Sequence, residues 1–221
     1  MSNFNRSKPL YIEKSLFVGM NIDDEQELRQ HILNLREFIT EKGIEISRFV
    51  PIWSLHITLL EIHLHSPIMN QNCFDRFLNL IKDSADEIRN DIKTLKPTRF
   101  VYGEIGDSVK ICFVKQSRNI LEKVQKKVTS IFKSANIGRL EESIEFYPHV
   151  TIMTRSRSNN PFEVNLEREV IKDCIENINR LNQLPKFIPK IINVLLPRGH
   201  FSKHPNDKQY IRQLKKLKEN L

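Results

Sequence analysis

Two copies of a His-x-Thr tripeptide, His56-Ile57-Thr58 and His149-Val150-Thr151, are the residues of this sequence best suited to chemistry. Side chains alternate across a β-strand, so the histidine and the threonine of each copy point to the same face. The middle residue, Ile57 or Val150, then points into the core. Each copy therefore places an imidazole beside a hydroxyl group on a rigid strand.

Two such copies facing one another could cleave a phosphodiester bond by attack of an adjacent hydroxyl group. Imidazole has an ordinary pKa of about 6.5, so one neutral histidine can take a proton while a protonated one gives a proton to the leaving oxygen. Threonine hydroxyls can donate hydrogen bonds to the non-bridging phosphate oxygens. We therefore predict that His56 and His149 are catalytic and that Thr58 and Thr151 bind phosphate, with no metal and no cofactor. The sequence does not say which histidine is the acid.

A single His-x-Thr copy is explained more simply by a histidine that hydrogen-bonds within the core or at a sheet edge. Two copies, each within an apolar strand, favour a shared site. His63 and His65 follow the first copy, but on a regular strand His63 would face away from His56. No carboxylate or cysteine stands at ligand spacing, so we expect no metal site.

Four further residues are candidates for substrate binding. Trp53 precedes the first tripeptide and Tyr147 the second, where an aromatic ring at the mouth of a groove could stack on a base. Tyr102 is a weaker candidate of the same kind, and all three rings could equally belong to the core. Arg155 follows the second tripeptide by four residues and could pair with a phosphate.

The elements that must position these residues follow from hydrophobic periodicity. Helices are expected from Asp23 to Ile39, where Gly43 follows the end, and at 72–92, 117–134 and 163–180. Strands are expected at 15–19, 44–50, 55–64, 99–104, 109–115, 146–153 and 190–196, with a turn at Gly106-Asp107-Ser108. Each half of the chain carries a helix followed by a strand with His-x-Thr. This order suggests two similar α+β lobes that face each other.

Composition sets broader limits. The chain has 221 residues, of which 39% are hydrophobic, enough for a real core. Its three cysteines show no pairing pattern, and no segment resembles a secretory signal or a membrane span, so we expect a cytoplasmic or nuclear protein. The net charge of +8 favours anionic partners such as nucleotides and RNA. The positive charge is equally well explained by a solvated basic face that has no specific ligand.

The sequence resembles the two-histidine (2H) phosphoesterase superfamily, whose mark is a pair of His-x-Thr/Ser motifs some 90 residues apart. The segments around the two tripeptides, 54–60 and 146–153, are most similar to the central domain of the γ/δ-type A-kinase anchoring proteins, and the stretch from Phe100 to Lys115 also fits that group. The resemblance covers residues 14–200. Residues 1–13 are expected to form a flexible leader and residues 201–221 a basic C-terminal segment.

The resemblance implies an α+β, two-lobed, LigT-like fold in which two antiparallel-rich sheets flank a central groove, with helices outside. It implies cleavage of 2′-5′-linked oligoadenylates or of related RNA phosphodiesters by a monomer. Opening of 2′,3′-cyclic phosphates, trimming of RNA 3′ ends, and binding of AMP without turnover are the alternatives it leaves open. A further alternative, which rests on the charge of the chain, is a basic RNA-binding protein without catalysis. The tail after Tyr210 is short and rich in lysine, so we do not expect a kinase regulatory subunit as a partner.

Overall fold

The computed structural model describes residues 10–11, 15–22, 25–45, 48–64, 68–69, 71–103, 106–136, 138–140, 146–154, 158, 160–181, 183–189 and 192–195. Arg155 and the whole of the predicted basic segment 201–221 lie outside the described residues. Of the predicted leader, Leu10–Tyr11 form strand β1, which pairs with β4 (Ile68–Met69) in a small two-stranded sheet.

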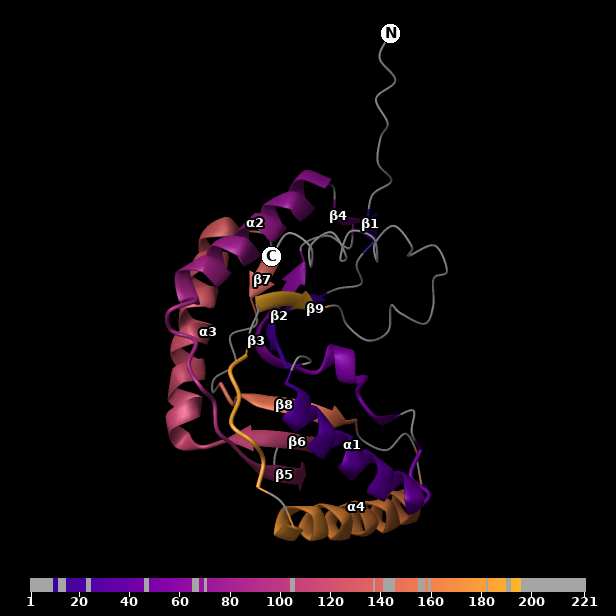
Figure 1. The fold of residues 1–221 in the computed structure, drawn as a ribbon. Helices are drawn as coiled ribbons and strands as arrows, with labels where there is room; N and C mark the ends of the chain where they lie inside the picture. Colours follow the sequence, from indigo (N-terminus) through magenta and orange to yellow (C-terminus); the bar gives the residue numbers. More distant parts are fainter. Residues whose placement is uncertain are drawn as a thin grey trace.

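A seven-stranded antiparallel sheet forms the centre of the molecule (Figure 1). Six of its strands run in the order β5-β6-β8-β3-β2-β9, and β7 pairs with the far part of β3. Their bounds are β2 Ser15–Asn21, β3 His56–Leu64, β5 Pro97–Gly103, β6 Gly106–Phe113, β7 Gly138–Leu140, β8 His149–Met153 and β9 Ile192–Leu195. The predicted α+β class is confirmed.

This sheet consists of two halves that meet at a single residue pair. Strands β5, β6 and β8 pair along their lengths, as do β2, β3 and β9. Between β3 and β8, however, the only Cα partners among the described residues are Ile57 and Val150. The two predicted lobes are therefore the two halves of the sheet, and they join at the middle residues of the two tripeptides.

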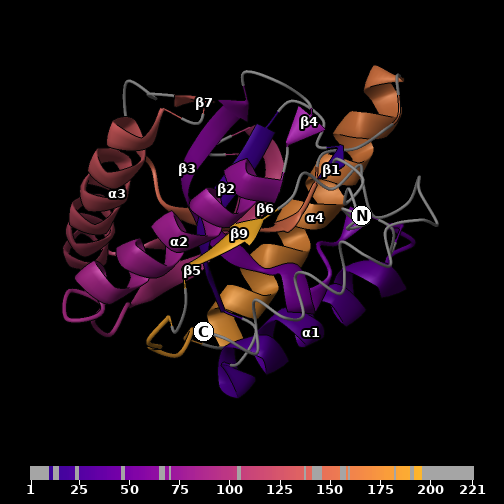
Figure 2. The same ribbon diagram turned by 90° about the horizontal axis from the view of Figure 1, so that it is seen from above.

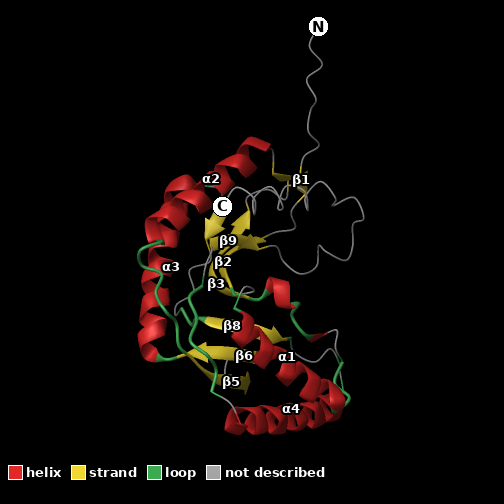
Figure 3. Cartoon of the chain, in the orientation of Figure 1, coloured by secondary structure: helices red, strands yellow, loops and turns green. Residues whose placement is uncertain are grey.

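Long helices cover the sheet (Figures 2 and 3). They are α1 Gln26–Glu41, α2 Gln71–Ile88, α3 Lys115–Ala135 and α4 Pro161–Leu181. Helices α2 and α3 contact each other and the half of the sheet that contains β3 and β9. Helix α1 packs against α4, and α4 contacts β5 in the other half. None of the described helices combines the length and the apolar character that a membrane span requires.

The first helix illustrates how well the periodic pattern predicted the helices. Its apolar residues Leu28, Ile32, Leu35 and Ile39 are all buried, at spacings of four, three and four. Gly43 follows with a positive φ of +85°, and its N–H group donates to the carbonyl oxygen of Thr40. All four predicted helices are found within four residues of their expected ends.

Two predictions at the level of single elements were wrong. The described residues of the segment 44–50 form no regular strand, and only Phe49 among them makes an isolated bridge, to Met153. The turn expected at 106–108 lies earlier, because Gly106 already begins β6 and pairs with Gly103. Gly103 has a φ of +79°, so it supplies the left-handed backbone conformation that the tight connection needs.

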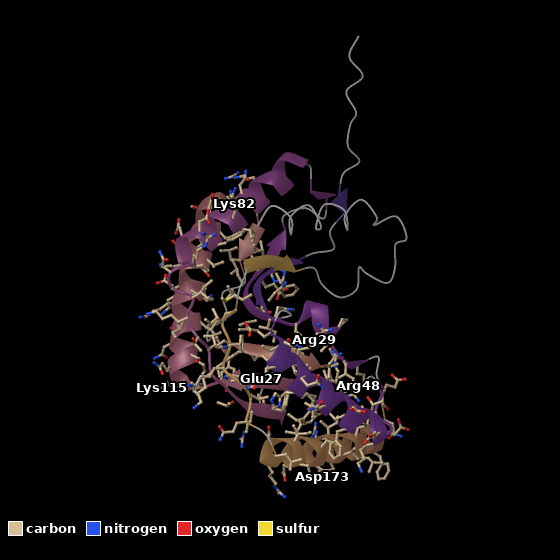
Figure 4. The ribbon with its side chains drawn as sticks, in the orientation of Figure 1. Glu27, Arg29, Arg48, Lys82, Lys115 and Asp173 are labelled. Carbon is tan, nitrogen blue, oxygen red and sulfur yellow. The ribbon has the colours of Figure 1, made fainter. Side chains whose placement is uncertain are left out.

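The segment before β3 is attached to the end of β8 through Arg48. Its side chain is only 3% exposed, and its guanidinium group forms an ion pair with Glu167 of α4 at 2.5 Å. The same guanidinium donates to the carbonyl oxygen of Thr154 at 3.3 Å and 3.4 Å, and Thr154 donates back to the carbonyl of Arg48. Figure 4 shows Arg48 on the side of the molecule where α1 and α4 lie. This contact joins α4 to the strand that carries the second tripeptide.

Candidate active site

The two tripeptides lie side by side at the junction of the sheet halves. Ile57 pairs with Val150, and both side chains are 0% exposed. Residues directly opposite in an antiparallel pair share a face, and their neighbours along each strand share the other face. The histidines and threonines therefore lie together on the face opposite to this buried pair. All four are partly exposed, as a site open to substrate requires.

The neighbouring strands extend this arrangement across the sheet. On β2, Asn21 pairs with His56 and Gly19 with Thr58. On β6, Lys110 pairs with Thr151 and Cys112 with His149. Continuing the β3–β8 register by one residue in each direction gives two rows on one face of the sheet. The first row is Lys110, Thr151, His56 and Asn21; the second is Cys112, His149, Thr58 and Gly19.

Both imidazoles are held in the same way. Nδ1 of His56 lies 2.7 Å from the carbonyl oxygen of Ser54, and Nδ1 of His149 lies 2.9 Å from that of Tyr147. A carbonyl oxygen can only accept, so each Nδ1 carries the proton. In the neutral ring Nε2 is then unprotonated and can act as a base; in the charged ring Nε2 can donate a proton. The two histidines are thus equivalent in tautomer and differ only in their surroundings.

These surroundings favour the neutral form of His149. Burial lowers its pKa below the ordinary value, and the charges of Lys110 and His56 lower it further. The hydrogen bond that His149 donates to the carbonyl oxygen of Tyr147 opposes these effects, because it raises the pKa. The influence of His56 also means that the two imidazoles lie close enough to affect each other's charge. The pair therefore favours one positive charge over two.

The structure brings only some of the other predicted residues to this site. The backbone of Tyr147 holds His149, while the Arg118 guanidinium covers one face of its ring, 5.6 Å from the centroid, so at most one face could stack on a base. Trp53 lies in the short 3-10 helix Ile52–Ser54, directly before β3, and its side chain is outside the described part of the structure. Arg155 follows the last described residue of that segment, so its role stays a prediction.

Tyr102 does not join the tripeptides. It pairs with Val109 on β6, whereas the neighbouring pair Val101 and Lys110 faces the site. Its side chain forms a hydrogen bond with Arg168 of α4. Tyr102 therefore belongs to the contact between β5 and α4, on the other face of the sheet.

The expectation that His63 faces away from His56 was wrong, because β3 is not a regular strand. The pairing of β3 with β2 skips Leu59, which leaves one extra residue beyond Thr58. This bulge shifts the alternation by one residue, so His63 lies on the same face as His56. Within the described ranges no three His, Cys, Asp or Glu side chains form a group that could hold a metal ion.

Three side chains of the two rows, those of Lys110, Cys112 and Asn21, were missed from the sequence. Lys110 and Cys112 are both buried on β6, and Cys112 is not part of a disulfide. Asn21 ends β2, and among the described residues its buried Oδ1 atom has no hydrogen-bond partner. The signal for Lys110 was its position as the one charged residue in the run Val109–Phe113. Nothing in the sequence marks Asn21, because its place depends on the register between two strands.

A family model described as "AKAP7 2'5' RNA ligase-like domain" matches residues 15–219 of this chain. No curated protein is similar enough to count as a match. Several solved structures are similar. Usb1 of Kluyveromyces marxianus with uridine monophosphate is 10% identical and has a TM-score of 0.51, with 85% of this chain and 96% of that chain covered.

A conserved protein of unknown function from Agrobacterium tumefaciens is 11% identical, with a TM-score of 0.52 over 88% of this chain and 95% of that chain. E. coli LigT complexed with 3'-AMP is 18% identical, with a TM-score of 0.46 over 69% of this chain and 77% of that chain. The two matches with TM-scores above 0.5 show that the chain shares the fold of those proteins.

Proposed function

This chain belongs to the family of the AKAP7 2'5' RNA ligase-like domain, within the 2H phosphoesterase superfamily, and from that premise we propose that it is a metal-independent phosphodiesterase of 2′-5′-linked oligoadenylates or related RNA. One observation carries the proposal: the pairing of Ile57 with Val150, which puts both His-x-Thr tripeptides on one face of the sheet. Binding of a nucleotide alone does not require two adjacent imidazoles with identical tautomers.

In the proposed reaction His149 is the general base and His56 the general acid. His149 suits the first role because burial favours its neutral form, which leaves Nε2 free to accept a proton. For a 2′-5′ linkage, the neighbouring 3′ hydroxyl attacks phosphorus and gives its proton to His149. The bond from phosphorus to the 5′ oxygen breaks, and protonated His56 donates its Nε2 proton to that leaving oxygen. The products are a 2′,3′-cyclic phosphate and a 5′ hydroxyl.

The threonines and Asn21 complete the proposed binding of substrate. The hydroxyl groups of Thr58 and Thr151 donate hydrogen bonds to the non-bridging oxygens, where negative charge increases in the transition state. The Oδ1 atom of Asn21, which lies opposite His56 and has no hydrogen-bond partner among the described residues, accepts a hydrogen bond from a ribose hydroxyl of the substrate. We propose that the enzyme acts as a monomer in the cytoplasm or nucleus, where RNA and oligonucleotides are available.

The test is a panel of substrates in EDTA: 2′-5′ oligoadenylate, 3′-5′ oligoadenylate and 2′,3′-cyclic nucleotides. We expect cleavage of the 2′-5′ linkage, and a loss of about 100-fold or more in kcat for His56→Ala and for His149→Ala. His63→Ala is the matched control, since His63 is on the same strand but about 16 Å from Thr58. If the wild type bound AMP saturably but formed no product from any substrate, the protein would be a nucleotide-binding module and not an enzyme.

A further inference from the structure

Lys110 lies at the end of the first row, beside a predicted phosphate-binding threonine. It pairs with Thr151 on β8, and its neighbour Ile111 pairs with Val150. Because Val150 points into the core, Lys110 shares the opposite face with Thr151 and with the two histidines. The position is set by the backbone register of three consecutive pairs, from Lys110 to Cys112.

The burial of Lys110 is unusual for its residue type. It is only 6% exposed, between Val109 and Ile111, which are both 0% exposed. Lysines are almost never buried to this extent unless their charge is paired. Burial accordingly lowers the pKa of Lys110, although the nearby Cys112 thiol opposes this effect. Partial burial weakens the screening of this charge by water and so strengthens its attraction for a bound phosphate.

We propose that Lys110 is a further phosphate-binding residue of the active site and places its ammonium group against a non-bridging oxygen of the phosphate that Thr151 holds. The inference rests on the proposed function, since it concerns the same bound phosphate. The phosphate gains negative charge as the attacking oxygen approaches, so Lys110 stabilises the transition state more than the bound substrate. Arginine would not fill the same role, because lysine offers a compact charge at the end of a slender stem.

Lys110 also acts on His149. The groups that face His149 are Lys110 and Cys112 from β6 and His56 from β3, while Arg118 of α3 lies over the ring of Tyr147. The positive charge of Lys110 makes it harder for His149 to take up a second positive charge nearby. Removing the charge of Lys110 should therefore raise the pKa of His149, which a purely structural role would not do.

Lys110→Met tests the proposal, because methionine keeps a long apolar side chain in the same place and removes the charge. Lys123→Met is the matched control: the same change at an exposed position on α3. We would measure the affinity for AMP by calorimetry, the pKa of His149 by NMR, and kcat for 2′-5′ oligoadenylate. For Lys110→Met we expect affinity to fall by about tenfold, the pKa of His149 to rise, and kcat to fall by about 10- to 100-fold. Lys123→Met should match the wild type in all three.

The proposal is overturned if Lys110→Met binds AMP within twofold of the wild type and the pKa of His149 stays unchanged. Lys110→Arg, which keeps the charge, should leave the pKa of His149 low. If Lys110→Met does not fold, the wild type still tests the proposal. The NMR signal of the Lys110 Cε group should then shift when AMP is added, and an unchanged signal would refute the contact between Lys110 and the phosphate. A wild type that cleaves no substrate would refute the proposed function, whereas the AMP and NMR measurements would still decide the role of Lys110.

Discussion

Glu167→Gln should destabilise the protein although residue 167 lies outside the site. In the native protein the Glu167 carboxylate compensates the guanidinium of Arg48, which is 3% exposed and holds the end of β8 through Thr154. Glutamine has nearly the same size and can still accept a hydrogen bond. The variant therefore removes the charge while it leaves the packing in place.

The expected size follows from the burial of the two partners. Removal of one partner from a fully buried pair costs about 3–5 kcal/mol, because the other charge is left uncompensated. The side chain of Glu167 is 31% exposed, so water reaches part of the pair and a loss of about 2 kcal/mol is expected. For a protein of this size that loss lowers Tm by about 4–8 °C.

Urea unfolding and calorimetry would measure the loss, with Glu169→Gln as the control. Glu169 is on the same helix and pairs with Lys172, but its side chain is 68% exposed, so its loss should be under about 0.5 kcal/mol. The double variant with Arg48→Met and Glu167→Leu should recover most of the stability, since no charge is then left buried. Equal losses in Glu167→Gln and Glu169→Gln would refute the importance of the buried pair.

Three further results are expected. Ser117→Ala should cost about 1–2 kcal/mol in urea unfolding, because the buried Ser117 hydroxyl accepts the N–H of Lys96 at 2.8 Å and that donor would lose its partner; an unchanged midpoint would contradict this. Ile57→Ala should cost about 2–4 kcal/mol, since it leaves a cavity at the junction of the sheet halves; a loss under about 1 kcal/mol would mean that the junction contributes little. Because the pKa of His149 is lowered on folding, the unfolded chain binds more protons below about pH 6.5, so stability should fall as the pH decreases below that value; His149→Gln should flatten this part of the profile, and an unaltered slope would refute the shift.

The parts of the fold that depend on local patterns could be predicted from the sequence. The apolar face of α1 gives one example, because Leu28 to Ile39 follow the helical period and all face the core. The two tripeptides are another: alternation along a strand was enough to predict that Ile57 and Val150 are buried. Such predictions need only the geometry of a single element.

The parts that depend on contacts between distant segments could not be predicted. Phe49 lies in the segment 44–50, which was expected to form a strand, yet among its described residues only Phe49 makes a bridge, to Met153 of β8. The bulge at Leu59, which puts His63 on the same face of β3 as His56, arises from the register with β2. Lys110 joins the site for the same reason, since its pairing with Thr151 brings together residues 41 positions apart. Register between strands leaves little trace in a single sequence.

The central claim is that His56 and His149 act on one phosphate in one site. A double-mutant cycle tests it most directly, with kcat for cleavage of 2′-5′ oligoadenylate in EDTA measured for the wild type, His56→Ala, His149→Ala and the double variant. Groups that act as a unit give non-additive losses, so the double variant should be no slower than the slower single variant. Losses that multiply in the double variant would show that the two histidines act independently, and would contradict the shared site.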